Sequence, residues 1–477
     1  MTGNRTKIVT TLGPASEDEA VLTAMVEAGM DLARLNLSHG DRQWHTAIVE
    51  KLRGVEQKAG VFLGIVADLH GPRIRVGRLL SGSVCLRSGA DVTLTTEDCL
   101  GSADLVPVDY PLLAQDVAEG QRILLDDGLL ELCVTDIEGQ RVHCRVVNGG
   151  ELREDKGLNL PGATISMPTI TDRDREDLFF ALDLGVDYIA LSFVRSADDV
   201  RELRELIGQA GADARIIAKL EKPEALDDLD AILEESDAIM IARGDLGVEM
   251  RPEQVPLVQK HIITRCMAFR KPVITATQML DSMRWNPRPT RAEVADVANA
   301  ILDGTDAVML SGETAIGKYP IEAVRMMTSI GTETEAYQAR LLRLQPEVAE
   351  TEERLIVADA VAHAAAQTAT KLRAKLIVAF TQSGWTARLV SKCRAPMPVV
   401  AATPVVATAR RCSLYWGVTP LLMEPTQSTD AMIAAVSIAC RQRGLADVGD
   451  TLVFTAGSPM RPGTTNSMLV EKVGDGA

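Results

Sequence analysis

The 477-residue chain lacks an excess of basic residues, paired cysteines and long hydrophobic stretches. Its formal net charge of -16 argues against nucleic acid as the main partner, because a phosphate backbone is bound by a basic surface. Its 8 cysteines are irregularly spaced without a CxxC pair, which indicates a reducing compartment rather than a disulfide framework or a zinc site. No apolar run approaches the roughly 18 residues of a membrane span, and residues 1–6 are too short and polar for a signal peptide. We therefore expect a cytoplasmic protein that does not bind a membrane.

What the chain does have is a series of short apolar runs that alternate with helical patterns. The runs cover residues 7–11, 32–37, 61–67, 188–193, 216–220, 238–242, 272–277 and 307–310. Most of them end in polar or glycine-containing residues, such as SHG after Leu37 and DLHGPR after Ala67. Strands that alternate with helices in this number predict a (β/α)8 TIM barrel, whose active sites lie at the carboxyl ends of the strands.

The third run is followed by short β-like pieces broken by Gly and Asp, and a helical pattern resumes only after Thr171, a plausible N-cap. This pattern predicts an all-β lid domain, residues 69–168, inserted into a barrel formed by residues 1–68 and 169–345. The two barrel segments together come close to the typical length of about 250 residues. Residues 346–477 alternate between helical patterns and apolar runs again and predict a C-terminal α/β sandwich domain.

The stretch 216–250 holds two apolar runs that each end in charge, with a predicted helix at 223–235 between them. Lys219, Glu221, Arg243 and Asp245 therefore fall at strand ends. Two carboxylates beside fixed cations suit Mg²⁺ better than Zn²⁺, because Mg²⁺ takes oxygen ligands and keeps several positions for substrate and water. The alternative is that these charges form ordinary ion pairs with one another.

In the C-terminal domain, the loop TQSGWT at residues 381–386 precedes a helical pattern. Hydroxyl groups and a glycine at a helix start suit a phosphate, since free backbone N–H groups and the helix dipole converge there. An ordinary N-cap loop is the alternative interpretation.

The sequence resembles the pyruvate kinase family over nearly its whole length. The motifs that carry the resemblance are TLGPAS, RLNLSHG, DLHGPRIR, KGLNLPG, AKLEKPEA, ARGDLGVE, TATQMLDSM and MLSGETAIGKYP, all in order. The resemblance implies a barrel with an inserted lid and a C-terminal effector domain. It further implies phosphoryl transfer from phosphoenolpyruvate to ADP with Mg²⁺ or Mn²⁺, and a homotetramer.

The resemblance also implies roles for residues of the barrel. Glu221 and Asp245 match the magnesium ligands, while Lys219 and Arg34 match the cations that contact the transferring phosphoryl group. Thr277 matches a threonine near the carbon that is protonated. Substrate contacts are implied for Arg34, Lys219, Ala242, Gly244, Asp245, Thr277 and Ser311. Ser311 and Glu313 match a pair around the reacting lysine.

Nucleotide contacts are implied for Pro14, Asn36, His39, Arg75 and the lid lysine Lys156. A monovalent-cation pocket is implied for Asn36, Ser38, Asp68 and Leu69. The chain departs from K⁺-dependent members at two positions, because Arg73 stands where they carry Glu and Leu69 where they carry Thr. A tethered guanidinium can supply the charge that the ion brings elsewhere, so we expect activity that does not require K⁺.

In the C-terminal domain, the resemblance implies a phosphate loop made of Thr381, Gln382, Ser383, Gly384, Trp385 and Thr386. Gln382 stands where members that respond to fructose bisphosphate carry Lys, and the later loop AGSPMRPGTTN lacks the Trp that those members place there. We therefore expect activation by a monophosphate, either a sugar phosphate or AMP.

Two other functions remain open at this point. A Mg²⁺-dependent pyruvate aldolase on a similar barrel could use the Glu and Asp pair, although it has no need for KGLNLPG in a lid. A non-catalytic effector-sensing homologue would be expected to have lost Lys219 or a metal carboxylate, and both are present.

Overall fold

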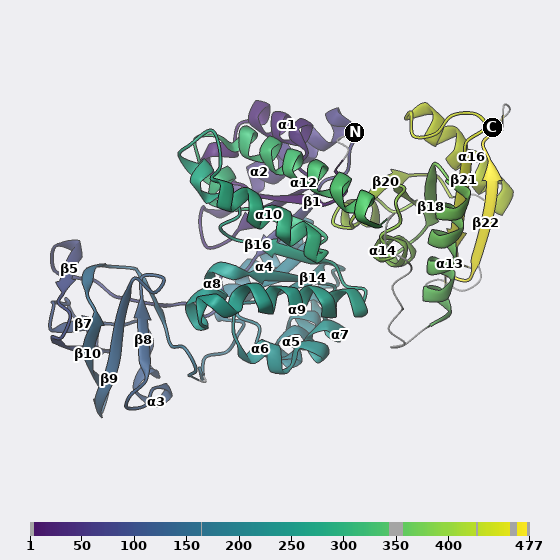
Figure 1. Cartoon of the computed structure of the whole chain (residues 1–477). Coiled ribbons are helices and arrows are strands. Elements are labelled where there is room, and N and C mark those ends of the chain that lie inside the picture. Colours follow the sequence, from purple (N-terminus) through teal and green to yellow (C-terminus); the bar gives the residue numbers. More distant parts are fainter. Residues whose placement is uncertain (1–3, 164, 343–355, 426–427, 458–464, 475–477) are drawn as a thin grey trace.

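The computed structural model describes residues 4–163, 165–342, 356–425, 428–457 and 465–474 (Figure 1). Within them, eight parallel strands close into a barrel in the order β1, β17, β16, β15, β14, β13, β3, β2. The barrel strands are β1 (Lys7–Thr11), β2 (Leu32–Asn36), β3 (Gly64–Asp68), β13 (Tyr188–Leu191), β14 (Arg215–Leu220), β15 (Ala238–Ala242), β16 (Val273–Ala276) and β17 (Ala307–Leu310). The predicted TIM barrel is therefore confirmed.

The barrel strands are apolar almost throughout because both of their faces are covered. Every residue of β3 and of β15 is buried. The main barrel helices are α1 (Glu19–Ala28), α2 (Arg42–Ala59), α4 (Asp172–Asp183), α5 (Ala197–Gln209), α6 (Glu224–Asp227), α7 (Leu229–Glu235), α8 (Arg243–Glu249), α9 (Val255–Ala268), α10 (Arg291–Asp303), α11 (Gly312–Ala315) and α12 (Pro320–Leu342). Helix α4 begins at the predicted N-cap, where the Thr171 side chain accepts the Asp174 N–H.

The single helix predicted at 223–235 is wrong, because the structure divides it into α6 and α7. Asp228 between them has φ -108° and ψ 19°, outside the helical region. Its carboxylate accepts the Ala197 N–H at 2.7 Å, at the start of α5. A contact with a neighbouring helix thus interrupts a segment whose own pattern favours continuous helix.

The inserted region is all-β, as predicted, and lies at one end of the molecule in Figure 1. Its seven-stranded sheet has the order β4, β12, β8, β9, β10, β6, β7, and β11 pairs separately with β5. These strands are β4 (Ile74–Arg75), β5 (Ser83–Leu86), β6 (Asp91–Thr95), β7 (Leu105–Pro107), β8 (Arg122–Leu125), β9 (Leu130–Glu138), β10 (Arg141–Asn148), β11 (Gly150–Arg153) and β12 (Gly157–Asn159), with the short helix α3 (Leu113–Asp116). This inserted domain, which we call the lid, has a hydrophobic core of its own.

The C-terminal region lies at the opposite end of the barrel from the lid (Figure 1). Its sheet has the order β20, β19, β18, β21, β22, in which β22 is antiparallel and the other four strands are parallel. Its elements are α13 (Val357–Leu372), β18 (Leu376–Phe380), α14 (Trp385–Lys392), β19 (Val399–Thr403), α15 (Val406–Cys412), β20 (Val418–Leu422), α16 (Thr429–Gln442), β21 (Thr451–Ala456) and β22 (Ser467–Lys472). The predicted α/β domain is confirmed.

The C-terminal domain packs against the amino ends of the barrel strands. Asp306, directly before β17, forms an ion pair with Lys392 at the end of α14. The Tyr188 hydroxyl at the start of β13 donates to the Arg411 carbonyl at 2.9 Å. The opposite end of the barrel therefore remains accessible on the lid side. No helix among the described residues is long and apolar enough to cross a membrane.

Candidate active site

Four charged side chains from three barrel strands meet at the carboxyl ends of those strands. The Lys219 Nζ atom at the end of β14 lies 2.9 Å from Oε1 of Glu221 and 3.1 Å from Oδ1 of Asp68. The Arg34 Nε atom of β2 lies 2.6 Å from the other Asp68 oxygen. Lys219, Glu221 and Asp68 are all buried, so the barrel holds two cations and two carboxylates away from bulk water.

Burial and the surrounding charges set the protonation of this cluster. Burial disfavours the charged form of Asp68, but Arg34 and Lys219 outweigh it and lower the pKa of this carboxyl. Burial likewise opposes the Lys219 ammonium, but Asp68 and Glu221 raise the pKa of Lys219 above its usual value. The lysine therefore carries a positive charge that is fixed in position before any ligand binds, which is the condition for electrostatic stabilisation of a transition state.

The Glu221 carboxylate has fewer hydrogen-bond and ion-pair partners than the Asp68 carboxylate. Its Oε2 atom accepts the Phe193 N–H at 2.9 Å, and Phe193 has a positive φ of 55° at this turn. Its Oε1 atom has the Lys219 ammonium 2.9 Å away as an ion-pair partner, but it accepts no well-directed hydrogen bond from the described residues. Burial and repulsion by Asp245 raise the pKa of Glu221 despite the nearby Lys219. A buried carboxylate in this state is suited to bind a further cation.

Asp245 supplies the second carboxylate from helix α8, which begins as β15 ends. The Gly244 N–H donates to Oγ1 of Thr277 at 2.7 Å, and Thr277 has a φ of 68° at the end of β16. A substrate carboxylate near Gly244, as predicted, has to compete with the threonine for this N–H. Asp245 remains partly exposed, with one oxygen 3.9 Å from an Arg73 nitrogen.

The donor set fits a hard divalent cation. Among the described residues no group of three or more His, Cys, Asp and Glu side chains is placed to hold a metal ion. Glu221 and Asp245 instead provide oxygen atoms only. Mg²⁺ is held in many phosphate-handling sites by one or two carboxylates plus substrate oxygens. The pair therefore fits Mg²⁺ or Mn²⁺ by its chemistry.

The remaining barrel residues surround this cluster from other strand ends. Glu313 is buried and accepts the N–H groups of Ser311 at 2.8 Å and Leu280 at 3.0 Å, which ties the loops after β17 and β16 together. Ala242 ends β15 and is buried. The Ser311 hydroxyl oxygen is buried and has no hydrogen-bond partner among the described residues.

The predicted monovalent-cation pocket follows β2 and β3. The Asn36 side chain accepts the Ser38 N–H at 3.2 Å, and the Ser38 hydroxyl contacts Nδ1 of His70 at 2.9 Å. Leu69 is buried and contributes no side-chain oxygen. Both Asp68 oxygens in turn contact protein cations.

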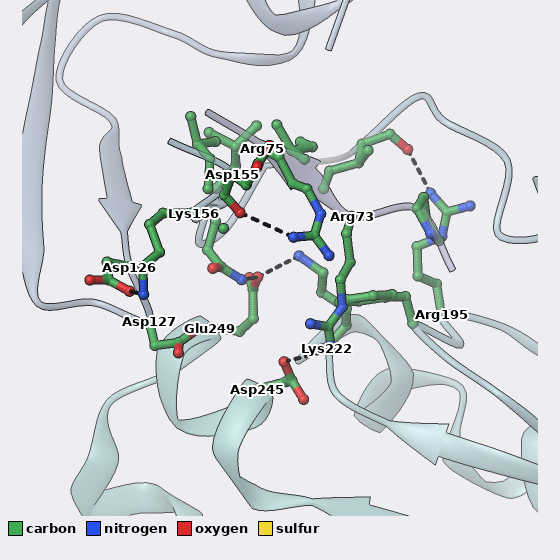
Figure 2. Close-up of a pocket in the computed structure, with 18 residues that line it drawn as sticks. Arg73, Arg75, Asp126, Asp127, Asp155, Lys156, Arg195, Lys222, Asp245 and Glu249 are labelled. Atoms are coloured by element: carbon green, nitrogen blue, oxygen red, sulfur yellow. Dashed lines mark hydrogen bonds and ion pairs between the residues drawn. The ribbon is translucent and has the colours of Figure 1, made fainter. Parts of the chain in front are cut away.

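A cleft lies between lid residues such as Asp126 and Lys156 and the barrel residues Lys222, Asp245 and Glu249 (Figure 2). Arg73 and Arg75, which lie where the chain passes from β3 into the lid, line this cleft. The Arg75 guanidinium donates to the Asp155 carbonyl at 3.0 Å. Lys156 lies on the lid side, where its Nζ atom is 2.7 Å from an oxygen of Asp126.

The other predicted nucleotide contacts lie on the barrel outside the lining of this cleft. Pro14 opens the short turn η1 (Pro14–Ser16) that follows β1. His39 follows β2, where burial and then the charges of Arg73 and Arg75 lower the pKa of its imidazole.

Comparison with known proteins gives a consistent result. A model of the pyruvate kinase barrel domain matches residues 3–324, and a model of the pyruvate kinase alpha/beta domain matches residues 359–471. The chain belongs to the pyruvate kinase family. It is accordingly a phosphotransferase.

Individual relatives resemble the chain over nearly its full length. The pyruvate kinase of Staphylococcus saprophyticus is 46% identical over 477 residues, which cover 99% of this chain and 81% of that protein. The pyruvate kinase of Staphylococcus aureus strain MRSA252 is 45% identical over 476 residues, with the same coverage. The crystal structure of a pyruvate kinase from Cryptosporidium parvum has a TM-score of 0.91 at 36% identity and covers 98% of this chain and 96% of that one.

The predicted phosphate loop, residues 381–386, connects β18 to α14. Gly384 has a φ of 89° at the N-cap of α14, and its N–H donates to Oγ1 of Thr381 at 2.9 Å. The Thr386 hydroxyl contacts the Thr465 hydroxyl at 2.8 Å. Gln382 and Ser383 are exposed at the tip of the loop. Trp385 begins α14, with its ring 4.6 Å from the Arg388 guanidinium carbon.

Sequence reasoning missed several residues of the site. The Ser192 hydroxyl accepts from Lys219 Nζ at 2.6 Å and donates to the Leu69 carbonyl at 2.8 Å. Lys222 and Glu249 line the cleft as a buried pair. Lys222 lies in the motif AKLEKPEA and Glu249 in the motif ARGDLGVE. Their positions in these two motifs could have identified them as site residues.

Proposed function

We propose that the chain transfers the phosphoryl group of phosphoenolpyruvate to ADP, giving pyruvate and ATP in the last step of glycolysis. The observation that carries the proposal is the buried Lys219, held 2.9 Å from Glu221 at the mouth of the barrel beside the cleft. A phosphoryl group in flight spreads negative charge over its oxygens, and fixed cations stabilise that charge more than they stabilise the substrate. Lys219 and Arg34 are the fixed cations that we assign to this task.

Glu221 and Asp245 are the residues that would hold Mg²⁺ or Mn²⁺. The ion supplies positive charge to the oxygens of phosphoenolpyruvate and orients them. The chain's own cations reach the same region, because Arg34 and Lys219 both contact Asp68 on the neighbouring strand β3.

Thr277 is assigned to the protonation of the enolpyruvate that phosphoryl transfer leaves behind. Its hydroxyl donates to the Ala276 carbonyl at 2.6 Å and accepts the Gly244 N–H at 2.7 Å. The hydroxyl proton is therefore engaged, and a threonine is a poor acid. We infer that Thr277 orients a water molecule, and that water delivers the proton to the methylene carbon. Ser311, Ala242 and Gly244 complete the assigned surroundings of the substrate.

Pro14, Asn36 and His39 on the barrel, together with Arg75 and Lys156 in the cleft, are assigned as contacts of the nucleotide. Lys156 forms an ion pair with Asp126 within the lid, so it has to leave that partner to reach a phosphate. Closure of the lid excludes water from the transferring group, and water would otherwise hydrolyse the donor.

A coupled assay tests the reaction and separates it from its alternatives. Lactate dehydrogenase and NADH report pyruvate that is formed from phosphoenolpyruvate with and without ADP. We expect pyruvate to form only when ADP and Mg²⁺ are both present. An aldolase produces pyruvate from its own aldol substrate without ADP, and a non-catalytic homologue produces none from phosphoenolpyruvate. Either of these results would overturn the proposal.

We further propose that the enzyme does not need K⁺. Leu69 offers no side-chain oxygen to an ion, and the Asp68 carboxylate already contacts Arg34 and Lys219. Arg73 adds a further cation at the edge of the cleft. The cytoplasmic location and the homotetramer also remain predictions. Light scattering on the purified 51.4 kDa chain measures the oligomeric state.

Activation by a sugar monophosphate or AMP is proposed for the loop from Thr381 to Thr386. The exposed Gln382 carries no charge to meet a second phosphate. Titration of the phosphoenolpyruvate saturation curve with each effector tests this. We expect the monophosphate to lower the half-saturating concentration, and activation by fructose bisphosphate alone contradicts the proposal.

A further inference from the structure

Lys222, Glu249 and Asn159 form a contact that joins the barrel to the lid at the cleft (Figure 2 labels the first two). The Lys222 Nζ atom lies 2.6 Å from Oε1 of Glu249. The Asn159 side-chain amide donates to the same Oε1 atom at 2.9 Å. The carboxylate is 1% exposed, so one buried oxygen receives a hydrogen bond from each side of the cleft.

Helix α8, which carries Asp245, is held at both of its ends. At its start, the Gly244 N–H donates to Thr277, and the Arg243 guanidinium makes two 2.7 Å contacts with Asp296. At its end, Glu249 is held by Lys222. Asp245 and Glu249 are four residues apart and therefore lie on the same face of the helix. The direction in which Asp245 points consequently depends on both attachments.

The two attachments differ in what they contain. The first consists of barrel residues only, since Thr277 follows β16 and Asp296 lies in α10. The second includes Asn159, the last residue of lid strand β12, which pairs with β4 and β8. Asn159 is therefore part of the lid sheet, whereas Lys222 follows barrel strand β14. Any movement of the lid changes the hydrogen bonding of Glu249 while the other end of α8 remains fixed.

We propose that Glu249 is a positioning residue that couples the lid to the metal-binding carboxylate: Asn159 sets the position of Glu249, and Glu249 sets the orientation of Asp245 through helix α8. The inference rests on the proposed function of Asp245 as a metal ligand. It assigns Lys222 to hold Glu249 on the barrel side. Residues that orient a metal ligand commonly affect metal affinity as strongly as some ligands do, because they fix the direction of the ligand oxygen.

The test uses the affinity of the free protein for Mn²⁺, measured by electron paramagnetic resonance without substrates. Asn159→Ala removes the lid's hydrogen bond while the buried Lys222 and Glu249 pair remains intact. Asn159→Asp places a carboxylate beside Glu249, so it is expected to weaken Mn²⁺ binding further. Asn148→Ala is the matched control, because the Asn148 amide also donates one hydrogen bond in the lid, to the Leu129 carbonyl at 2.9 Å.

We expect Asn159→Ala to weaken Mn²⁺ binding about tenfold and Asn148→Ala to leave it unchanged. In the Glu249→Ala background, where no acceptor remains for the Asn159 amide, Asn159→Ala is expected to add little, since residues that act through one another are not additive. A purely local structural contact predicts no change in Mn²⁺ affinity, so a shift of less than about threefold for Asn159→Ala overturns the inference. Additive effects in the double variant overturn the route through Glu249.

The same preparations distinguish this failure from that of the proposed function. The unsubstituted chain is assayed for ADP-dependent pyruvate formation beside the binding experiment. Loss of the Mn²⁺ effect in a fully active enzyme refutes only the coupling. Absence of the reaction in the unsubstituted chain refutes the proposed function, whatever the Mn²⁺ affinities are.

Discussion

The two ends of the barrel both bury carboxylates, but they satisfy them differently. At the amino ends of the strands, Asp306 accepts from Lys392 at 2.5 Å, from Arg394 at 3.0 Å and from the Val273 N–H at 2.8 Å. At the carboxyl ends, Glu221 has one oxygen that accepts no well-directed hydrogen bond from the described residues. The first carboxylate is surrounded by partners from two domains, whereas the second has capacity left over.

The difference separates a structural charge from a functional one. Buried polar atoms in folded proteins nearly always have hydrogen-bond partners, so a buried oxygen that has an ion pair but no well-directed hydrogen bond can accept a further ligand. Asp306 uses its partners to hold the C-terminal domain against the barrel. Glu221 lies beside Lys219 and is repelled by Asp245, and we propose that a divalent cation is its further partner. Substitutions at the amino ends of the strands are therefore expected to change stability, and substitutions at the carboxyl ends to change catalysis.

Asp306→Ala is expected to lower the free energy of unfolding by about 3–5 kcal/mol, because it leaves the buried Lys392 and the partly buried Arg394 without their anion. Chemical unfolding followed by circular dichroism measures the change. The rate per folded molecule is expected to persist, since Asp306 lies at the far end of the barrel from the cleft. Asp198→Ala is the control, because its exposed ion pair with Arg201 is screened by water. Equal effects of the two substitutions would contradict the structural role of Asp306.

Lys219→Met is expected to lower kcat by roughly 100- to 1000-fold, which corresponds to about 3–4 kcal/mol of transition-state stabilisation. The physical reason is that the variant removes the fixed charge that we propose meets the transferring phosphoryl group. The coupled assay measures kcat, and circular dichroism checks that the variant is folded. A kcat within about tenfold of the unsubstituted enzyme would remove Lys219 from the mechanism.

Much of the fold was predictable because local pattern and tertiary environment agree. The run at 238–242 coincides with β15, since a strand buried on both faces is apolar throughout and ends where charge begins. The split between α6 and α7 was not predictable, because it depends on a hydrogen bond from Ala197, which is distant in sequence. Strands β20 and β22 were also missed.

The candidate site was predictable only as a set of residue types. The two-residue spacing of Lys219 and Glu221 indicates that both face one side of a strand, and the structure places their charged atoms 2.9 Å apart. The contributions of Ser192 and Phe193 could not be foreseen, because they depend on β13 being the neighbour of β14 and on a backbone turn with positive φ. Sequence gives the chemistry of a strand end, while strand order decides which ends meet.

Lys271, before β16 at the amino ends of the strands, provides a pH-dependent test of the structural end. Burial and then the charge of Arg388 lower the pKa of Lys271 to about 8 from its usual 10.5. Between these values the unfolded chain binds more protons, so the contribution of Lys271 to stability rises with pH and is lost as the pH falls through about 8.

Relative to a Lys271→Gln variant, the unsubstituted chain is therefore expected to gain roughly 1–2 kcal/mol of unfolding free energy between about pH 8 and pH 10. Urea unfolding of both proteins at the two pH values measures this difference. Parallel pH profiles for the two proteins would show that the Lys271 ammonium is not destabilised by its surroundings.

Replacing Na⁺ by K⁺ is expected to have the smallest effect, a change in kcat of less than about tenfold, which is less than about 1.4 kcal/mol of activation free energy. We propose that protein cations at the carboxyl ends of the barrel strands replace the monovalent ion, since Arg34 and Lys219 contact Asp68 and Arg73 lies 3.9 Å from Asp245. The Arg73→Glu variant removes that cation and adds an anion, so its activity is expected to rise with K⁺. If K⁺ activates the unsubstituted enzyme tenfold or more, the proposal that protein cations replace the monovalent ion is wrong.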